Sequence, residues 1–498
     1  MADHRDYPDL AAARTGGAVL HVTDETSARA DGMLVVTAPA ARGASARDGW
    51  EPRRRRGPGH DAAIVRLGMP GRVRAVVVDT SFFEGEHPEE CSLEGVALPG
   101  HPEVAALLSE DLVWTELVPR VALTAGAENV LEVTANVRVT HVRLRTFPGG
   151  GVARLRVHGE VLPSPRVLAR PESDLGAVER GGRVVACTGT TVDAARRLVL
   201  PGRALDRSDG WETPRRRDGG PDSVLVELAG RGALHRVVVD TAPFRGSAPE
   251  SVTLEIADAR GRDVASLGDT DFVEILPRTR LLGDTVHEIE DELRPHAPGT
   301  HVRLRVWPDG GVGRLRLFGT LSPDGAEAHG VRYVNTLPAG DAERAFLHCC
   351  GSQVFARTMA LARPFASLEA MIAEALRVWR GLSPADWDEA FRAHPEIGGK
   401  KAEGPQTATS ATWSRGEQSK VGSAEASTLA ELAKGNAAYR EKFGRIYIVC
   451  ATGRSADELL AILRGRLDNG PDEELTIAAD EQRKITELRL EKLVLGRR

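Results

Sequence analysis

One histidine in the last third of the chain stands beside a proline and glycine loop. His394 opens the sequence His-Pro-Glu-Ile-Gly-Gly-Lys and follows a segment with one apolar side. Histidine changes its charge near neutral pH, so it can accept or donate a proton in a reaction at physiological pH. A carboxylate beside the ring would orient it and stabilise its charged form. His394 is therefore a candidate acid/base residue.

A second polar group follows twenty residues later. Ser414, Glu417 and Gln418 are spaced i, i+3 and i+4, so on a helix they would share one face. That face offers a hydroxyl, a carboxylate and an amide, which suit a small polar ligand. The alternative is structural: Ser414 is an N-cap with Glu417 completing a capping box, and His394 caps a helix end. The residues alone leave both interpretations open.

The first two thirds of the chain place an aromatic, an acidic and several basic residues together twice. Asp-Gly-Trp-Glu precedes a run of arginines at Trp50 and again at Trp211. A guanidinium fork matches carboxylate and ureido oxygens, and a glutamate can accept N–H bonds from a urea group. The alternative is that the arginines are solvated and the tryptophans anchor the core. The candidate residues are Trp50, Glu51, Arg54 and His141, with Trp211, Glu212, Arg215 and His301 in the second copy.

These motifs belong to a long internal repeat. Trp50 and Trp211 are 161 residues apart, and Thr-His-Val-Arg-Leu-Arg recurs from Thr140 to Thr300, a step of 160. A nearly constant step of this size indicates two copies of one domain. Residues 141–145 and 153–158 alternate between polar and apolar around a Pro/Gly turn, which predicts a β-hairpin. We expect an antiparallel β-sandwich in each copy, over residues 1–165 and 166–325.

The remainder, 331–498, is typical of a separate all-α domain. Ser383-Pro384 is a helix start signal, and Ser455 with Glu458 forms a capping box. A further helix is predicted to begin at Pro471. All lysines lie between Lys400 and Lys492, which suggests segments of different origin.

Composition limits the function classes. The 498 residues are 41% hydrophobic with a net charge of -6, which predicts packed domains with no overall attraction to nucleic acid or an anionic membrane. We expect neither a signal peptide nor a membrane span. Five cysteines without a Cys-x-x-Cys pair favour a reducing cytoplasm. We expect a homo-oligomer that binds small molecules.

The C-terminal motifs resemble the 2-oxo-4-hydroxy-4-carboxy-5-ureidoimidazoline (OHCU) decarboxylase family of urate breakdown. The similar segments are Arg-Pro-Phe-Ala-Ser-Leu-Glu-Ala from Arg363, the His394 motif, the Ser414 motif, Asn436 to Gly444 and Tyr447 to Ala451. The resemblance implies an all-α fold, no cofactor and no metal, with His394 and Glu417 as catalytic residues. It also implies that the substrate is lined by Pro395, Ser414, Arg415, Gly416, Glu417, Gln418, Tyr447, Ile448, Val449, Cys450 and Ala451.

The two N-terminal copies resemble allantoicase. The similar segments are the Trp50 motif, Ile-Val-Arg-Leu-Gly from Ile64, Val-Asp-Thr-Ser-Phe-Phe-Glu-Gly-Glu-His-Pro from Val78, and the Thr140 and Thr300 segments. The resemblance implies two tandem jelly-roll-like, galactose-binding-like sandwiches that hydrolyse allantoate to ureidoglycolate and urea. The whole chain would then be a bifunctional enzyme of purine breakdown. The alternative is that only the decarboxylase is active and the sandwiches are a degenerate binding or oligomerisation scaffold.

Overall fold

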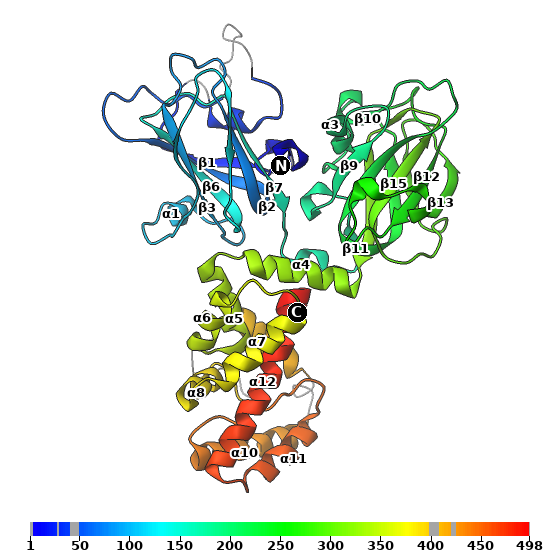
Figure 1. Cartoon of the computed structure of the whole chain (residues 1–498). Coiled ribbons are helices and arrows are strands. Elements are labelled where there is room, and N and C mark those ends of the chain that lie inside the picture. The colour runs from blue at the N-terminus through cyan, green and yellow to red at the C-terminus, as the bar shows by residue number, and fades with distance from the viewer. Residues whose placement is uncertain (1–2, 27–28, 40–48, 398–407, 420–424, 498) are drawn as a thin grey trace. The chain divides into compact units, whose positions relative to one another are not determined.

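Figure 1 shows the computed structural model of the chain, which describes residues 3–26, 29–39, 49–397, 408–419 and 425–497. The chain divides into two compact units, Met1–Ala326 and Glu327–Arg498. The first unit consists of two large antiparallel β-sheet domains and the second is helical, so the predicted fold class is confirmed. None of the helices that the structure describes has the length and apolar character needed for a membrane crossing.

The first repeat is a seven-stranded sheet in which hydrogen-bonded neighbours follow the order β1-β2-β6-β3-β4. Its strands are β1 Ala18–Val22, β2 Asp61–Asp79, β3 Glu90–Val96, β4 Thr115–Ala122, β5 Glu128–Glu132, β6 Arg138–Phe147 and β7 Arg154–Val161. Along β6 and β7 the burial of side chains alternates, because successive residues of a strand point to opposite faces of the sheet.

The second repeat is an eight-stranded sheet with the path β13-β12-β15-β11-β17-β8. Its strands are β8 Ser173–Asp174, β9 Arg183–Cys187, β11 Asp222–Asp240, β12 Ser251–Ala257, β13 Val273–Arg280, β14 Val286–Ile289, β15 Gly299–Trp307 and β17 Arg314–Leu321. The short strands β10 Trp211–Glu212 and β16 Gly311–Val312 pair separately. Short helices α1 Val104–Leu107, α2 Pro165–Leu168 and α3 Val192–Ala195 and the 3₁₀ turns η4 Val178–Arg180 and η5 Arg196–Val199 connect the strands.

The predicted hairpin between the two alternating segments is wrong. Strands β6 and β7 do not pair with each other: β6 pairs with β2 from Asp61 to Arg72, and β7 pairs with β2 from Gly71 to Asp79. The same arrangement joins β15 and β17 to β11 in the second repeat. Alternation reports that one face of a strand is buried, but a partner as long as β2 can pair with both strands in turn.

The turn after β6 and the matching turn after β15 each lie close to the rest of their domain, which explains their glycines. A Cβ atom on Gly151 would lie 2.0 Å from Cδ1 of Phe83, and one on Gly311 would lie equally close to Cδ1 of Phe244. Only glycine leaves room for the phenylalanine rings at these positions.

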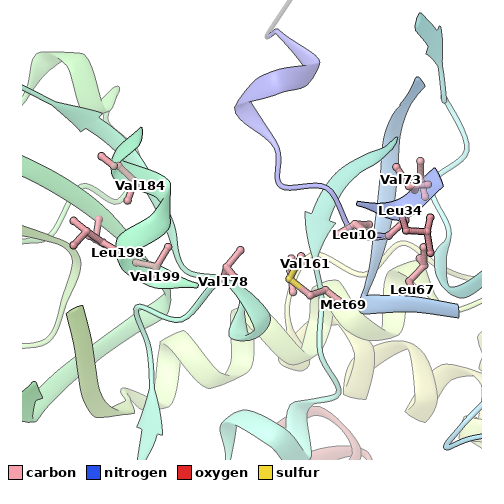
Figure 2. Packing of buried hydrophobic residues seen from close by; sticks show 14 of the residues in the cluster. Leu10, Leu34, Leu67, Met69, Val73, Val161, Val178, Val184, Leu198 and Val199 are labelled. Carbon is pink, nitrogen blue, oxygen red and sulfur yellow. The ribbon is translucent and has the colours of Figure 1, made fainter. Parts of the chain in front are cut away.

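A buried hydrophobic cluster fills the β unit, and Figure 2 shows part of it, from Leu10 and Met69 in the first repeat to Val178 and Val199 in the second. Burial of these side chains is the main force that stabilises each sheet.

The helices of the second unit are α4 Pro323–Thr336, α5 Ala339–Cys350, α6 Gln353–Leu361, α7 Leu368–Arg380, α8 Pro384–Arg392, α9 Ala408–Glu417, α10 Ala426–Phe443, α11 Ala456–Arg466 and α12 Pro471–Leu495. The three predicted helix starts are confirmed. Ser383 and Ser455 each accept a hydrogen bond from a backbone N–H three residues later, and Pro471 is the first residue of α12. Helix α12 contacts α5 and α7 and supplies part of the core.

Candidate functional site

Helix α8 places His394 just beyond its end. The backbone N–H of His394 donates to the carbonyl of Phe391 at 3.0 Å, which closes the last turn. The side chain is only 6% exposed, and its Nε2 atom has no hydrogen-bond partner among the described residues. The continuation of this motif, residues 398–400, lies outside the described residues.

Burial lowers the pKa of His394 to about 3, and the nearby charge of Arg489 lowers it further while Glu417 opposes the shift. The imidazole is therefore neutral at pH 7. A neutral ring can accept a proton from a bound molecule and pass it on.

Helix α9 carries Ser414 and Glu417 in its last turns. The structural alternative for Ser414, an N-cap, is wrong because this residue lies inside the helix near its C-terminal end. Gln418 follows directly and continues the helical pattern, since its N–H donates to the carbonyl of Ser414 at 3.1 Å. The predicted shared face is thus present.

Glu417 is held by two cations from α12. The Nε and Nη2 atoms of Arg489 donate to the two carboxylate oxygens at 3.1 and 2.9 Å, and Lys492 Nζ donates at 3.0 Å. Arg489 also donates to the hydroxyl of Ser414 at 2.9 Å. Burial alone would raise the pKa of Glu417, but Arg489 and Lys492 outweigh it and lower the pKa to about 2. Glu417 is ionised throughout the neutral range.

Arg489 is a residue of this site that the predicted set of site residues does not include. It is 1% exposed. A signal was present: Gln482, Ile485 and Arg489 follow the 3.6-residue period of one helix face, and all three are buried. An arginine on the apolar face of a helix needs a buried anionic partner.

A small cavity joins these elements. Its lining comprises His394, Pro395, Ile397, Ser414, Glu417, Gln418, Tyr447, Ile448, Val449, Ala451, Thr452 and Ile485. Eight of the residues predicted to contact substrate are among them. Three are not: Arg415 and Gly416 are exposed, and Cys450 directs its N–H to Glu481 at 2.8 Å. Helix α9 can turn only one side to the cavity, so the residues between Ser414 and Glu417 face away.

The volume of this cavity is about 20 Å³, which is room for about one water molecule. A ureido acid is larger, so the lining side chains must move apart when such a molecule binds.

Buried polar side chains hold the backbone of both loop segments in the cavity. Arg466 Nη1 donates to the carbonyl of Ile448 at 2.6 Å, and its Nε donates to Glu474 at 2.7 Å. Asn436 Nδ2 donates to the carbonyl of Ile397 at 3.0 Å. These bonds fix segments 394–397 and 447–451 relative to α10 and α11.

In the β repeats, the two tryptophans are fully buried. Trp50 forms a β-bridge with Val152 and its Nε1 donates to the carbonyl of Asp24 at 2.9 Å, and Trp211 pairs with Val312. The structure therefore supports the alternative that they anchor the motif. Asp48, which opens the motif in the first repeat, lies outside the described residues.

The arginine that reaches inward is one position later than predicted. Arg54, Arg215 and Arg55 are all exposed, but the Nη2 atom of Arg55 donates to the buried carboxylate of Asp61 at 2.6 Å. The equivalent pair in the second repeat is Arg216 and Asp222, at 2.9 Å. Thr23 and Thr188 donate to the same oxygen, Oδ1, of each aspartate. The second oxygen, Oδ2, of both aspartates is buried without a hydrogen-bond partner among the described residues.

Glu51 lies beside this pair in sequence and is nearly buried, and its carbonyl accepts from the Thr26 N–H at 2.9 Å. Glu212 in the second repeat is partly exposed and forms an ion pair with Arg207.

The structure does not bring the histidines to this site. His141 pairs with Arg66 in β2, five residues along the strand from Asp61, which corresponds to about 17 Å. Its Nδ1 lies 2.8 Å from the hydroxyl of Thr140, and burial lowers its pKa to about 4. His301 is placed in the same way beside Thr300. Placing these histidines in one site with Trp50 and Trp211 was wrong. Two residues that recur at matching positions of both repeats can still lie at the far end of a strand from the tryptophan motif.

Known proteins match both units. A family model described as allantoicase repeat matches residues 8–162 and 173–322, and one described as OHCU decarboxylase matches residues 335–491. A probable allantoicase of Streptomyces avermitilis is 40% identical over 344 residues, 66% of this chain and 89% of that protein.

Two solved structures are similar to parts of this chain. A crystal structure of allantoicase from Saccharomyces cerevisiae has a TM-score of 0.54 and 29% identity, covering 63% of this chain and 92% of that chain. A crystal structure of OHCU decarboxylase in the presence of (S)-allantoin is 41% identical, covering 30% of this chain and 96% of that one, with a TM-score of 0.26. The chain belongs to the allantoicase family and carries an OHCU decarboxylase domain after its two allantoicase repeats.

Proposed function

We propose that this chain is a bifunctional enzyme of purine breakdown. Its helical unit decarboxylates OHCU to (S)-allantoin, and its β unit hydrolyses allantoate to ureidoglycolate and urea. The observation that carries the proposal is one cavity lined by His394, Ser414 and Glu417, with the buried Arg489 bound to Ser414 and Glu417. Small anionic ureides are the substrates of both reactions.

The charges of the helical site suit an anionic substrate. Glu417 contributes one negative charge, while Arg489 and Lys492 contribute two positive charges, so the buried group carries a net charge of about +1. A substrate carboxylate would neutralise that charge. Because water is excluded, the field of these fixed groups acts strongly on a bound anion.

The chemistry needs only proton transfer from the protein. When the C4–carboxylate bond breaks, carbon dioxide leaves and the electron pair forms a C4=C5 bond while the electrons of the conjugated C5=N bond move to the ring nitrogen, which takes up one proton from solvent. The resulting enol loses its hydroxyl proton and gains a proton at C5 to give allantoin. A neutral His394 can take the first proton and deliver one to a single face of C5, which would make the product a single enantiomer.

For the β unit, the candidate groups are the Arg55–Asp61 and Arg216–Asp222 pairs rather than Arg54 and Arg215. Hydrolysis of allantoate adds water across the carbon–nitrogen bond that releases urea. A buried carboxylate with one unpaired oxygen can accept a proton or a ureido N–H, and an arginine can bind the carboxylate of the substrate. Glu51 and Glu212 are further candidates.

The second candidate function is a scaffold. The burial of Trp50, Trp211, His141 and His301 favours it, because four of the predicted contact residues serve the fold. In that case the β unit would bind without hydrolysing.

We also propose domains at 1–165, 166–325 and 331–498, a cytoplasmic location and a homo-oligomeric state. The five free cysteines support a reducing compartment. Light scattering of the purified chain measures the oligomeric state directly.

Two assays on the full chain test the proposal. Urea release from allantoate reports one reaction, and the optical activity of allantoin formed from OHCU reports the other. The variant His394→Asn should lose decarboxylation and keep urea release, and a double variant Arg55→Gln with Arg216→Gln should do the reverse. Urea release at the background rate by the wild-type protein would establish the scaffold instead.

A further inference from the structure

A cavity of about 540 Å³ lies inside the β unit, between its two repeats. The first repeat contributes the N-terminal segment around Tyr7 and Asp9 and part of β7, and the second contributes the region from Val178 to Leu200. This volume is within the range of about 300–1,000 Å³ that is typical of small-molecule sites. It is distinct from the Asp61 and Asp222 pairs, which are not in its lining.

The lining of this inter-repeat cavity is rich in cations. Its ionisable side chains include six arginines, two histidines and four carboxylates: Arg5, Arg14, Arg156, Arg183, Arg196, Arg197, His4, His158, Asp6, Asp9, Glu128 and Asp193. Arginines exceed the carboxylates of the lining by two, and an arginine without a partner on a concave surface attracts anions.

Several of these arginines have partners that do not line the cavity. Arg14 binds the carboxylate of Asp209, and Arg183 Nε donates to Glu227 at 2.5 Å. Asp9 accepts from the N–H groups of Ala11 and Val157 at 3.0 and 2.9 Å and lies 3.7 Å from Nη1 of Arg156. Arg197 is exposed and forms no ion pair with another described residue. Its guanidinium therefore remains available to an anion, whereas the other five arginines of the lining are in ion pairs.

The walls between these charges are apolar. Val178, Val184 and Val199 come from the second repeat and Met69 from the first, all labelled in Figure 2, and Leu200 adds to them. The ring of Tyr7 in the first repeat faces the guanidinium of Arg183 in the second, 6.0 Å from its centroid. Apolar walls with an aromatic ring favour a planar organic body over a bare inorganic ion.

We propose that the inter-repeat cavity binds an organic anion: a planar heterocycle that carries a phosphate or a carboxylate group. Contacts from both repeats would make binding sensitive to their relative arrangement. Arg14 links the cavity to the second repeat's Trp211 motif, because the carboxylate oxygen of Asp209 that it binds also accepts from the buried Arg314 at 2.9 Å. Occupancy of the cavity can thereby act on the segment that leads to Trp211.

Calorimetric titration of the full chain tests this site with two probes. Adenosine 5′-monophosphate carries a phosphate and orotate carries a carboxylate on a planar ring. We expect at least one to bind saturably with a Kd below about 1 mM, and adenosine and uracil, which lack the anionic group, to bind at least about tenfold more weakly. The stronger probe identifies the anionic group. Failure of both probes to bind would overturn the proposal, as would equal binding of the uncharged molecules.

Variants locate the binding. Leu200→Trp fills the cavity and should abolish binding, and Arg197→Gln, at an exposed position that does not threaten folding, should weaken it at least about fivefold. Arg170→Gln is the matched control, because this exposed arginine of the linker does not line the cavity. Binding that is unchanged in both cavity variants would place the ligand elsewhere and refute the proposal.

Discussion

Two nitrogens of Arg489 donate to the carboxylate of Glu417, which lies 72 residues earlier in the chain, and both side chains are almost inaccessible to solvent. The same guanidinium binds Ser414 and Ser410 of α9. One arginine on α12 therefore holds three polar side chains of α9, and two of them, Ser414 and Glu417, line the cavity with His394. The charges of Arg489 and Glu417 both act on the pKa of His394, in opposite directions.

This pairing predicts a large stability effect. Arg489→Gln leaves Glu417 buried with only Lys492 as a cationic partner, so we expect a loss of about 3–5 kcal/mol in the free energy of unfolding of the helical unit. The double variant with Glu417→Gln should recover most of that loss, because no buried charge then lacks its partner, yet it should still lack decarboxylase activity. Denaturant titration of the single and double variants measures the coupling. Additive losses in the double variant would contradict the buried-pair interpretation.

The low pKa of His394 predicts how stability depends on pH. The unfolded residue takes up a proton near pH 6.5, whereas the folded residue does so only near pH 3. Falling pH in this window therefore favours the unfolded chain, and the contribution of His394 is complete above about pH 6.5 and declines below it by at most about 1.4 kcal/mol per pH unit. Above about pH 4.5 Glu417 does not contribute to this decline, since its folded pKa of about 2 affects stability only below its ordinary value of 4.5.

Hydrogen exchange of the α12 amides at pH 7 and pH 5 measures this decline. The wild-type helical unit should lose about 2 kcal/mol more than His394→Asn between the two values. Equal losses in the two proteins would show that the folded imidazole is not neutral.

The bond from Arg466 to the Ile448 carbonyl predicts a positioning effect on catalysis. Arg466→Lys keeps the charge but loses the forked guanidinium that donates to both the Ile448 carbonyl and the Glu474 carboxylate. Segment 447–451 should therefore shift. We expect kcat/KM for decarboxylation to fall by about 10²-fold, mainly through kcat. Arg464→Lys on the same helix is the matched control, since Arg464 is exposed and its partner Glu431 is only half-buried. Equal kinetics in the two variants would remove Arg466 from the site.

The repeated Arg–Asp pairs predict whether both β repeats hydrolyse allantoate. Asp61→Asn and Asp222→Asn each keep the shape and the hydrogen bond from the neighbouring threonine but remove the charge. If both sites work, each variant should lose about half of the urea release, and the double variant should lose nearly all of it. If one variant alone abolishes activity, the two repeats build a single catalytic site or only one remains active. Decarboxylation serves as the folding control, and full urea release in the double variant would exclude both aspartates.

Local signals predicted the helix boundaries well. Ser383, Ser455 and Pro471 lie where each helix begins, because capping is decided within one turn of chain. Strands were predicted from alternation, but the predicted pairing of residues 141–145 with 153–158 was wrong, because pairing depends on residues far away in sequence. The predicted catalytic pair His394 and Glu417 lines one cavity, although their roles stay a prediction.

The missed residues share a physical cause. A run such as Arg53 to Arg56 does not reveal which side chain turns inward, and the carboxylate that decides it, Asp61, lies six residues beyond Arg55 at the start of a strand. Arg489 likewise became interpretable only once α9 was seen to pack against α12. Burial of a charge is set by its partner, and that partner is seldom near in sequence.

The long strand β2 has a practical consequence for handling the protein. After a protease cuts the glycine turn between β6 and β7, both strands remain hydrogen-bonded to β2, so β7 holds the C-terminal fragment to the N-terminal one. The nicked pieces should stay associated and migrate as one species until denatured, so a gel that shows two fragments need not mean that the native domain has been lost.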